Sequence, residues 1–234
     1  STATGLDAPV ASAEPAASAA TTETTTESFA AIETRVGELM AMAAAVEPAV
    51  TPLLQRHVAE VGGELIKLKY RLKTKGSAMR KVRARMADDP KLAPHEVVLD
   101  DCLRYTLQVG DEPAGHHVEV ILRVLAALKT EGHEVVRLKN YWPDDDNYSG
   151  VNSILRANNG LLWELQFHTP QSIAAAATRR NWYEELRCVD TKLERKRELF
   201  DKMTSEWNRV PIPKGILEPG ALGAHDDIIE RPRP

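Results

Sequence analysis

Glu164 is an acidic residue in an otherwise largely apolar run, residues 161–168. If this run is a β-strand, alternate side chains share a face, so Glu164 lies beside Gln166 and opposite Trp163 and Phe167. A carboxylate on a strand whose other face is strongly apolar is expected to point into a cleft, where it can accept a proton or help to hold a cation. The alternative is a half-buried antiparallel sheet on which Glu164 is only solvated.

A cation-rich segment lies far upstream, between Glu64 and Asp88, and its charged residues are all basic: Lys67, Lys69, Arg71, Lys73, Lys75, Arg80, Lys81, Arg83 and Arg85. Such a segment is either a solvated helix face or a site for polyanions, which leaves nucleic acid and nucleotide phosphate as candidates. The whole chain has a net charge of −4 and a pI near 6.0, so the positive field is local. A local field favours a polyphosphate bound with a metal ion over nucleic acid.

The candidate metal ligands are Asp100 and Asp101, which follow the apolar residues 97–99 and precede another apolar-rich extended run. We expect residues 97–99 to be a strand with the two acids at its mouth. The acids are candidate metal ligands because Mg²⁺ at nucleotide sites takes one or two carboxylates plus phosphate oxygens. The alternative is a turn or a cap. The triple Asp at 144–146 follows Pro143, and this favours a solvated turn over a metal site.

The elements that must position these residues can be read from turn residues and periodicity. Ala-Asn-Asn-Gly at 157–160 predicts a β-hairpin joining strands at 150–156 and 161–168. Residues 29–60 have helical periodicity, which we expect Pro48 and Pro52 to break. Residues 171–208 are expected to form one long helix or a broken one.

Composition divides the 234-residue chain into three parts. Residues 1–27 are rich in Ala and Thr and are expected to be disordered, because they have too little apolar surface to offset the entropy of ordering. Residues 28–208 are expected to form one catalytic domain, and 209–234 a loose Pro- and Gly-rich tail.

The two cysteines are far apart and favour a reducing compartment. We find neither a signal-peptide pattern nor an apolar run of membrane-spanning length, so no membrane partner is expected.

Five motifs in order resemble the synthetase domain of the RelA/SpoT family, which makes the alarmone (p)ppGpp. The resemblance covers about residues 60–170. The family's ATP-binding pattern R-x-K-x(3)-S-x(3)-K is matched by Arg71, Lys73, Ser77 and Lys81. Its D-x-x-G-I-R segment, which begins with the metal-binding Asp, is matched in part from Asp101. The donor side of the family's site is therefore well kept.

The remaining motifs concern the acceptor. The family's K-D-Y segment resembles Lys139-Asn-Tyr, and its N-G-Y-x-S-L-H segment resembles residues 146–152, with Tyr148 kept and Asn152 in place of His. E-[IV]-Q-I-R-T is matched from Glu164, with His168 in place of Arg. Several acceptor-side residues therefore differ from the family pattern.

The resemblance implies an α+β fold, with a mixed sheet of about five strands flanked by helices, like the family's nucleotidyltransferase-like domain. It implies an ATP-dependent pyrophosphokinase that transfers diphosphate to the 3′-hydroxyl of a purine nucleotide, with Mg²⁺ as cofactor. The implied roles are catalysis for Glu164, Asp101 and Gln166, metal binding for Asp101 and Glu164, ATP binding for Arg71, Lys73, Ser77 and Lys81, and acceptor binding for Tyr148, Lys139, Asn152 and His168. Tyr148 would stack on the acceptor base.

Two alternatives stay open. Divergent toxin-like members of this family act on adenosine nucleotides or on the 3′ end of tRNA, and the altered acceptor residues make this chain resemble them. The other alternative is an inactive module that only binds nucleotide or RNA. We expect a cytoplasmic protein, with secretion as an effector as the other possibility.

Overall fold

The computed structural model describes residues 17–142, 148–188 and 190–222, with side chains from residue 29 onward. It has one mixed sheet of five strands in the order β1-β2-β5-β4-β3. The strands are β1 (Glu64–Ile66), β2 (Arg104–Gln108), β3 (Glu134–Asn140), β4 (Val151–Arg156) and β5 (Leu162–His168). The pair β2·β5 is parallel and the other neighbouring pairs are antiparallel. The predicted α+β class with a mixed sheet of about five strands flanked by helices is confirmed.

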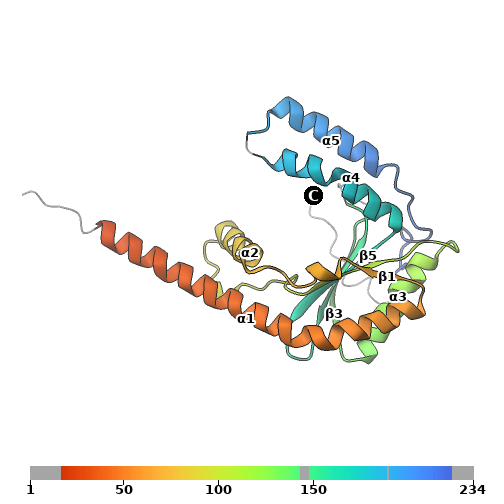
Figure 1. Ribbon diagram of the computed structural model, residues 1–234, viewed down its shortest axis with the longest axis horizontal. Helices are drawn as coiled ribbons and strands as arrows, with labels where there is room; N and C mark the ends of the chain where they lie inside the picture. Colours follow the sequence, from red (N-terminus) through yellow and green to blue (C-terminus); the bar gives the residue numbers. More distant parts are fainter. Residues whose placement is uncertain (1–16, 143–147, 189, 223–234) are drawn as a thin grey trace, which may run out of the picture.

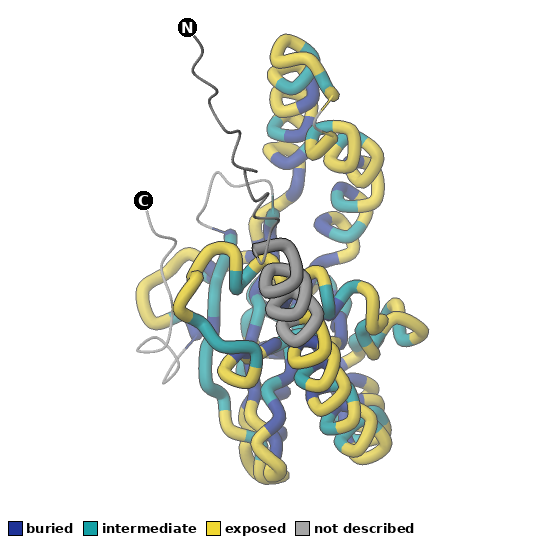
Figure 2. The backbone as a smooth tube through the Cα atoms, turned by 90° about the vertical axis from the view of Figure 1, so that its left-hand side faces the viewer, coloured by how far each residue is buried: buried dark blue, intermediate teal, exposed yellow. Residues whose placement is uncertain are grey.

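The helices are α1 (Ala17–Glu60), α2 (Lys75–Asp88), α3 (His116–Thr130), α4 (Pro170–Arg187) and α5 (Leu193–Trp207). In Figure 1, α1 and α3 lie against the sheet, while α4 and α5 run side by side beyond the end at which β5 finishes. The predicted segment 171–208 is thus a broken helix. Figure 2 shows that this pair projects from the body and exposes much of its surface.

The predicted hairpin is the pair β4–β5. Its turn closes through a 2.8 Å hydrogen bond from the amide of Gly160 to the carbonyl of Ala157, and Gly160 has a φ of 83°. Such a positive φ suits a residue without Cβ. On β5, Trp163 and Phe167 are fully buried, whereas Glu164 lies on the other, partly open face. The alternation predicted for this strand is confirmed.

The segment before β2 differs from the prediction. Residues 97–99 do not form a strand, and β2 begins only at Arg104, so the two acids lie in the connection just before it. There, Leu72 and Leu103 form an antiparallel bridge. The amide of Lys73 donates to the carbonyl of Cys102 at 3.0 Å on one side of this bridge. This backbone pairing aligns the cationic segment with the acids, and periodicity alone cannot reveal it because it is non-local.

Helix α1 runs without interruption through Pro48 and Pro52, so the predicted break is wrong. A proline removes one backbone hydrogen bond and bends a helix, but packing on both sides can keep the helix together. Val36 before the prolines and Leu54 after them are both fully buried in the core. The helix changes direction along its length in Figure 1. It also begins at Ala17, inside the expected disordered tail, of which residues 1–16 lie outside the described part.

By length and composition, the part of α1 from Phe29 to Glu60 could cross a membrane, with a mean hydropathy of 1.2 in its most apolar window. The expectation that no segment reaches this level is therefore wrong for this helix. Its buried aliphatic residues, which include Leu39, Val50 and Val58, belong to the same core cluster as the strands. Their burial gives the apolar face of this helix a partner within the chain.

The described part of the expected loose tail, up to residue 222, is packed against the domain. Val210, Ile216 and Leu222 are buried in the core cluster. The side-chain amide of Asn140 donates to the carbonyl of Ile216 at 2.8 Å. The expectation of a loose tail is therefore wrong for this part, because its aliphatic residues find a place beside β3. Residues 223–234 lie outside the described part.

Candidate active site

Two lysines of the cationic segment contact the acids before β2. Nζ of Lys73 lies 2.6 Å from Oδ2 of Asp101, and Nζ of Lys81 lies 2.9 Å from its Oδ1. Lys81 also lies 3.1 Å from Oδ1 of Asp100. The structure therefore brings together two of the predicted ATP-binding cations and the predicted metal carboxylate. Their roles stay predictions.

Helix α2 sets the spacing of the cations. Its N-cap is Thr74, whose hydroxyl accepts a 3.3 Å hydrogen bond from the amide of Ser77. Ser77, Lys81 and Arg85 follow one another at four-residue intervals and so lie along one face of the helix. Arg85 reaches Asp100 at 3.7 Å. The hydroxyl of Ser77 also contacts Arg80 at 3.0 Å.

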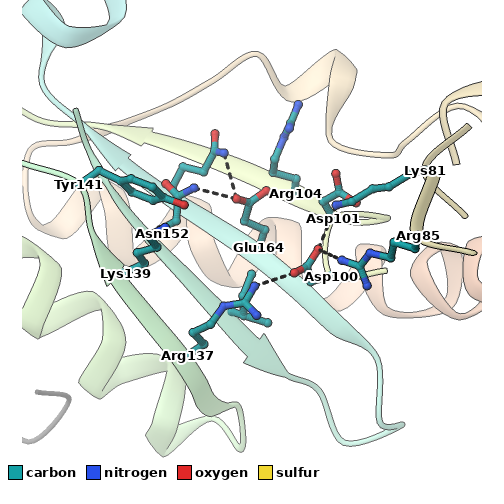
Figure 3. Close-up of a pocket in the computed structure, with 12 residues that line it drawn as sticks. Lys81, Arg85, Asp100, Asp101, Arg104, Arg137, Lys139, Tyr141, Asn152 and Glu164 are labelled. Atoms are coloured by element: carbon teal, nitrogen blue, oxygen red, sulfur yellow. Dashed lines mark hydrogen bonds and ion pairs between the residues drawn. The ribbon is translucent and has the colours of Figure 1, made fainter. Parts of the chain in front are cut away.

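Lys81, Arg85 and Asp100 lie at one side of a cavity of about 370 Å³, which Figure 3 shows in close-up. The cavity is lined by Lys81, Arg85, Asp100, Asp101, Arg104, Arg137, Lys139, Tyr141, Asn152, Ile154, Glu164 and Gln166. Six of these were predicted as site residues: Lys81, Asp101, Lys139, Asn152, Glu164 and Gln166. The cavity thus joins predicted donor, catalytic and acceptor residues that are far apart in the sequence.

Glu164 is held by two amide side chains on the same face of the sheet. Nδ2 of Asn152 donates to its Oε1 at 3.0 Å, and Nε2 of Gln166 donates to the same oxygen at 3.1 Å. Gln166 is in turn fixed by a 3.2 Å hydrogen bond from Thr106. Burial raises the pKa of Glu164 above its ordinary value, and the charges of Asp101 and Asp100 add to this effect. A carboxyl with a raised pKa is suited to accept a proton near neutral pH.

Asp100 and Asp101 have the opposite electrostatic setting. Burial alone would raise the pKa of Asp101, but the hydrogen bond from Lys73 and the ion pair with Lys81 outweigh it and lower that pKa below its ordinary value. The pKa of Asp100 is lowered in the same way, against burial, by Lys81 and by Arg137, which donates to it at 2.6 Å. Carboxyls whose pKa values are pushed apart in one site suit different roles. The two aspartates are the permanent anions, and Glu164 is the group that can change its protonation state.

The donor atoms of the site fit Mg²⁺ held mainly through a substrate. Oδ1 of Asp101 is buried and accepts no well-directed hydrogen bond, although Nζ of Lys81 lies close to it. Within the described ranges, no group of three or more His, Cys, Asp or Glu residues could hold a metal ion by itself. Mg²⁺ in phosphoryl-transfer sites uses one or two carboxylates and completes its shell with phosphate oxygens and water. Asp101 and Glu164, which share the cavity, match that pattern.

Arg71 faces a different neighbour from the other predicted ATP-binding residues. Its Nε donates to Oε1 of Glu47 on α1 at 2.5 Å, and its Nη1 donates to the carbonyl of Leu68 at 3.0 Å. Glu47 also accepts a 2.6 Å hydrogen bond from Thr51. Arg71 does not belong to the set of described residues that line the cavity. Its phosphate contact stays a prediction, and in this structure it ties the cationic segment to α1.

Two predicted acceptor residues, Tyr148 and His168, lie behind the cavity wall. The hydroxyl of Tyr148 donates to Oδ1 of Asn152 at 2.7 Å and lies 2.8 Å from Nε2 of His168. His168 is buried, and burial, followed by the charge of Lys67, lowers its pKa to about 4. The ring is enclosed between Tyr148 and Ser172 and is not among the described residues that line the cavity, so its acceptor contact stays a prediction.

The hydrogen bonds around Asn152 have a defined direction. The hydroxyl of Tyr148 has one proton and gives it to the amide oxygen of Asn152, so Nε2 of His168 must donate to Tyr148. Nδ1 of His168 lies 3.0 Å from Oγ of Ser172, whose hydroxyl donates to the carbonyl of Thr169 at 3.0 Å. The chain of bonds ends at Glu164, whose orientation it sets through Asn152.

The aromatic side chain on the cavity wall is Tyr141. The ring of Tyr148 meets it edge-on, with centroids 4.9 Å apart and planes at 84°, and Lys139 lies over the ring of Tyr141 at 4.3 Å. Arg137, Lys139 and Tyr141 are spaced by two along β3 and its end, and this spacing was the sequence signal for Arg137. Tyr141 also belongs to the segment that resembles the family's K-D-Y motif. Arg104 had no such signal, because its place depends on the parallel pairing of β2 with β5.

No known family model matches the sequence, and no curated protein matches it. The chain is structurally similar to the type VI effector Tas1, solved with its immunity protein, at 22% identity and a TM-score of 0.46, over 76% of this chain and 95% of that chain. It is also similar to a GTP pyrophosphokinase family protein from Streptococcus pneumoniae, at 13% identity and a TM-score of 0.46, over 73% and 84%.

A further similar structure is small alarmone synthetase 1 from Bacillus subtilis bound to its product pppGpp, at 14% identity and a TM-score of 0.40, over 59% of this chain and 70% of that chain. These values describe a distant likeness. The predicted resemblance to RelA/SpoT-type synthetases is thus confirmed as a distant structural similarity.

Proposed function

We propose that this protein is an ATP-dependent pyrophosphokinase that transfers diphosphate from ATP to the 3′-hydroxyl of a purine nucleotide. One observation carries the proposal. Lys73 and Lys81, at the spacing of the ATP-binding motif, lie within 3 Å of Asp101, and the cavity beside them contains Glu164. A phosphate clamp, a metal carboxylate and a base with a raised pKa are what this transfer requires.

The donor nucleotide binds on the side of α2. Lys81 and Arg85 present their charges toward the cavity, and Lys73 and Ser77 stand next to them. A triphosphate offers these cations more negative charge than the two aspartates do. The cations can therefore contact the triphosphate while they remain next to the aspartates. Bound Mg²⁺ would be held by Asp101 and Glu164 and would neutralise charge on the phosphate oxygens. Arg71 would steady this side through its ion pair with Glu47.

The transfer itself is a displacement at the β-phosphorus of ATP. The acceptor 3′-oxygen forms a bond to that phosphorus, and the bond from the phosphorus to the bridging oxygen of the α-phosphate breaks, so that AMP leaves. The proton of the 3′-hydroxyl passes to the carboxylate of Glu164, which Asn152 and Gln166 hold in place. The protein contributes positioning and charge stabilisation to this step.

The acceptor lies on the side of β3 and β4. Tyr141 offers an aromatic wall for the base, and base–aromatic stacks of this kind contribute about 1–3 kcal/mol in nucleic-acid binders. Lys139 and Asn152, paired across these two strands, complete this wall. Tyr148 supports the wall from behind through its contact with Tyr141.

The test is transfer of label from ATP carrying radioactive β- and γ-phosphates to GDP, GTP, ADP or AMP. We expect a labelled product with at least one acceptor, and its loss in Glu164→Gln. Glu134→Gln is the matched control, since Glu134 is exposed and pairs only at the surface with Arg156. No transfer to any of the four nucleotides, with no difference between wild type and Glu164→Gln, would reject this function.

The altered acceptor residues favour one second candidate, in which the acceptor is the 3′ end of tRNA. The buried position of His168 supports it, because the family's arginine at this place has no counterpart on the cavity surface. This candidate predicts transfer of label to bulk tRNA, and growth arrest on expression that Asp101→Ala relieves. Binding of ATP without transfer to any acceptor would instead indicate an inactive binding module.

A further inference from the structure

Glu47 is the one charged residue between Glu38 and Arg56 on helix α1. Its neighbours in this stretch are mainly Ala, Val, Leu, Met and Pro, and only 14% of its side chain is exposed. A carboxylate in such surroundings costs free energy unless it is paired and hydrogen-bonded. No step of the proposed transfer uses this carboxylate. Its partners therefore indicate what it does.

The carboxylate of Glu47 is held from two sides. Its Oε1 accepts a hydrogen bond at 2.6 Å from Thr51, which lies one turn further along α1, and another at 2.5 Å from Nε of Arg71. The hydrogen bond from Thr51, followed by the one from Arg71, lowers the pKa of Glu47 below its ordinary value. Glu47 is thus a fixed anion beside the first cation of the ATP-binding pattern.

The support of Glu47 continues into the core of the sheet. The hydroxyl of Thr51 gives its one proton to Glu47, so the hydroxyl of Tyr105, 2.6 Å away, donates to Thr51. Tyr105 lies on β2 and is 2% exposed, and its ring meets Trp163 of β5 edge-on with centroids 5.9 Å apart. The packed sheet therefore fixes Tyr105, and a chain of hydrogen bonds leads from there to Arg71.

The guanidinium of Arg71 is bound at two of its three nitrogens. Nε donates to Glu47, and Nη1 donates to the carbonyl of Leu68 at 3.0 Å. Nη2 has no hydrogen-bond partner within the part of the chain that the structure describes, and 32% of the side chain is exposed. The backbone is anchored too, because the carbonyl of Arg71 accepts from the amide of Arg104 at 2.8 Å. A guanidinium held in this way can donate to a ligand with little further loss of rotamer freedom.

We propose that Glu47 is a positioning residue for the donor nucleotide, which fixes the guanidinium of Arg71 so that its free nitrogen contacts ATP. This inference rests on the proposed function. Arg71 stands two residues before Lys73, which pairs with Asp101 of the cavity, so a donor that extends from Asp101 along this segment reaches Arg71. Glu47 acts through Arg71 and does not itself contact the nucleotide. Helix α1 thereby takes part in binding ATP without contributing a group to the reaction.

The experiment measures kcat and KM for ATP in Glu47→Gln, alone and combined with Arg71→Gln. Glutamine keeps the shape and removes the charge, so we expect KM for ATP to rise about 10-fold, equivalent to about 1.4 kcal/mol. The values of kcat and of KM for the acceptor should change less than about twofold. In the Arg71→Gln background, Glu47→Gln should add less than about twofold, because residues that act as one unit are not additive. Glu38→Gln is the matched control, since Glu38 is exposed on the same helix and pairs with Arg35.

A second pair of variants tests the same chain of hydrogen bonds with the charge of Glu47 kept. Thr51→Val removes the hydroxyl that donates to Glu47, and Thr51→Ser retains it. We expect KM for ATP to rise about 3-fold in Thr51→Val, as for the loss of one hydrogen bond, and to stay near the wild-type value in Thr51→Ser. This pair decides the inference if Glu47→Gln does not fold.

An unchanged KM for ATP in the folded variants, or an equal rise on adding Glu47→Gln to Arg71→Gln, would overturn this inference while leaving the transferase intact. A lower KM in Glu47→Gln would also overturn it, because the ion pair would then hold Arg71 away from ATP. If the wild type transfers nothing to any acceptor, the proposed function fails, and calorimetric binding of a non-hydrolysable ATP analogue decides the inference. A Kd that Glu47→Gln raises about 10-fold supports it. An unchanged Kd, or no binding by the wild type, contradicts it.

Discussion

Nζ of Lys73 lies 2.6 Å from Oδ2 of Asp101, and this ion pair spans 28 positions in the sequence. It places a motif lysine on the carboxylate that we assign to Mg²⁺, and both side chains are mostly buried. The pair is supported by the backbone bridge between Leu72 and Leu103. The lysine and the acid are thus in position before a nucleotide arrives, so that little reorganisation is needed when it binds.

Lys73→Gln is expected to lower the rate of diphosphate transfer by about 100-fold, because a preorganised cation at transferring phosphates acts mainly on the transition state. Lys75→Gln is the matched control, since Lys75 is exposed and pairs with Glu33 at the surface. The measurement is kcat and KM for ATP in both variants. A similar loss in the two variants would contradict the assignment of Lys73.

The pH profile should report Glu164. Its pKa is raised above 4.5, mainly by burial, and the mechanism uses its deprotonated form. The rate should therefore fall as the pH drops through this raised pKa. Glu164→Asp should keep this fall in rate at acidic pH. The residual rate of Glu164→Gln should not show it. A wild-type profile without an acidic limb between about pH 4.5 and 7 would speak against a base at this position.

The same carboxyl affects stability with a definite sign. Because the pKa of Glu164 is higher in the folded protein, its favourable contribution is present below pH 4.5 and is lost as the pH rises through the raised value. Glu164→Gln should therefore raise Tm at pH 8 relative to wild type and have a smaller effect at pH 4. Asp100 and Asp101 have lowered pKa values and should show the reverse, with stability lost as the pH falls. Thermal unfolding at the two pH values tests both directions.

The hydrogen-bond chain behind Glu164 makes Tyr148 and His168 positioning residues. Tyr148→Phe leaves the amide oxygen of Asn152 without its donor, so we expect kcat to fall about 10-fold with little change in KM for ATP. His168→Gln keeps a donor toward Tyr148 and should retain much more activity than His168→Leu. Equal losses in the two His168 variants would indicate that only the volume of the ring matters.

Removal of divalent metal should abolish transfer, because Mg²⁺ neutralises charge on the transferring phosphates. Within the described residues the carboxylates are too few to hold the ion alone, so it is expected to bind together with ATP. Transfer is measured with Mg²⁺, after EDTA, and after Mg²⁺ is returned. Asp101→Asn should require a higher Mg²⁺ concentration for half-maximal rate than wild type. Full activity of wild type in EDTA would reject the cofactor assignment.

Local sequence patterns determined the parts of this protein that depend on neighbours along the chain. The alternation in β5 predicts that Glu164 and Gln166 share a face, and Asn-Asn-Gly predicts the hairpin, because side-chain direction and turn geometry are set by a few adjacent residues. The spacing from Lys73 to Lys81 predicts the cations that reach Asp101. Each of these follows from short-range geometry, which the order of residues specifies directly.

Tertiary structure alone decided the rest. The parallel pairing of β2 with β5 places Arg104 beside Glu164, and the packing of α1 keeps that helix continuous through its two prolines. Packing also encloses His168 and places its ring against the hydroxyl of Tyr148. Strand pairing, burial and loss of hydration depend on residues far away in the chain. The spacing of residues therefore indicates which side chains can do chemistry, and only the packing shows which of them face the substrate.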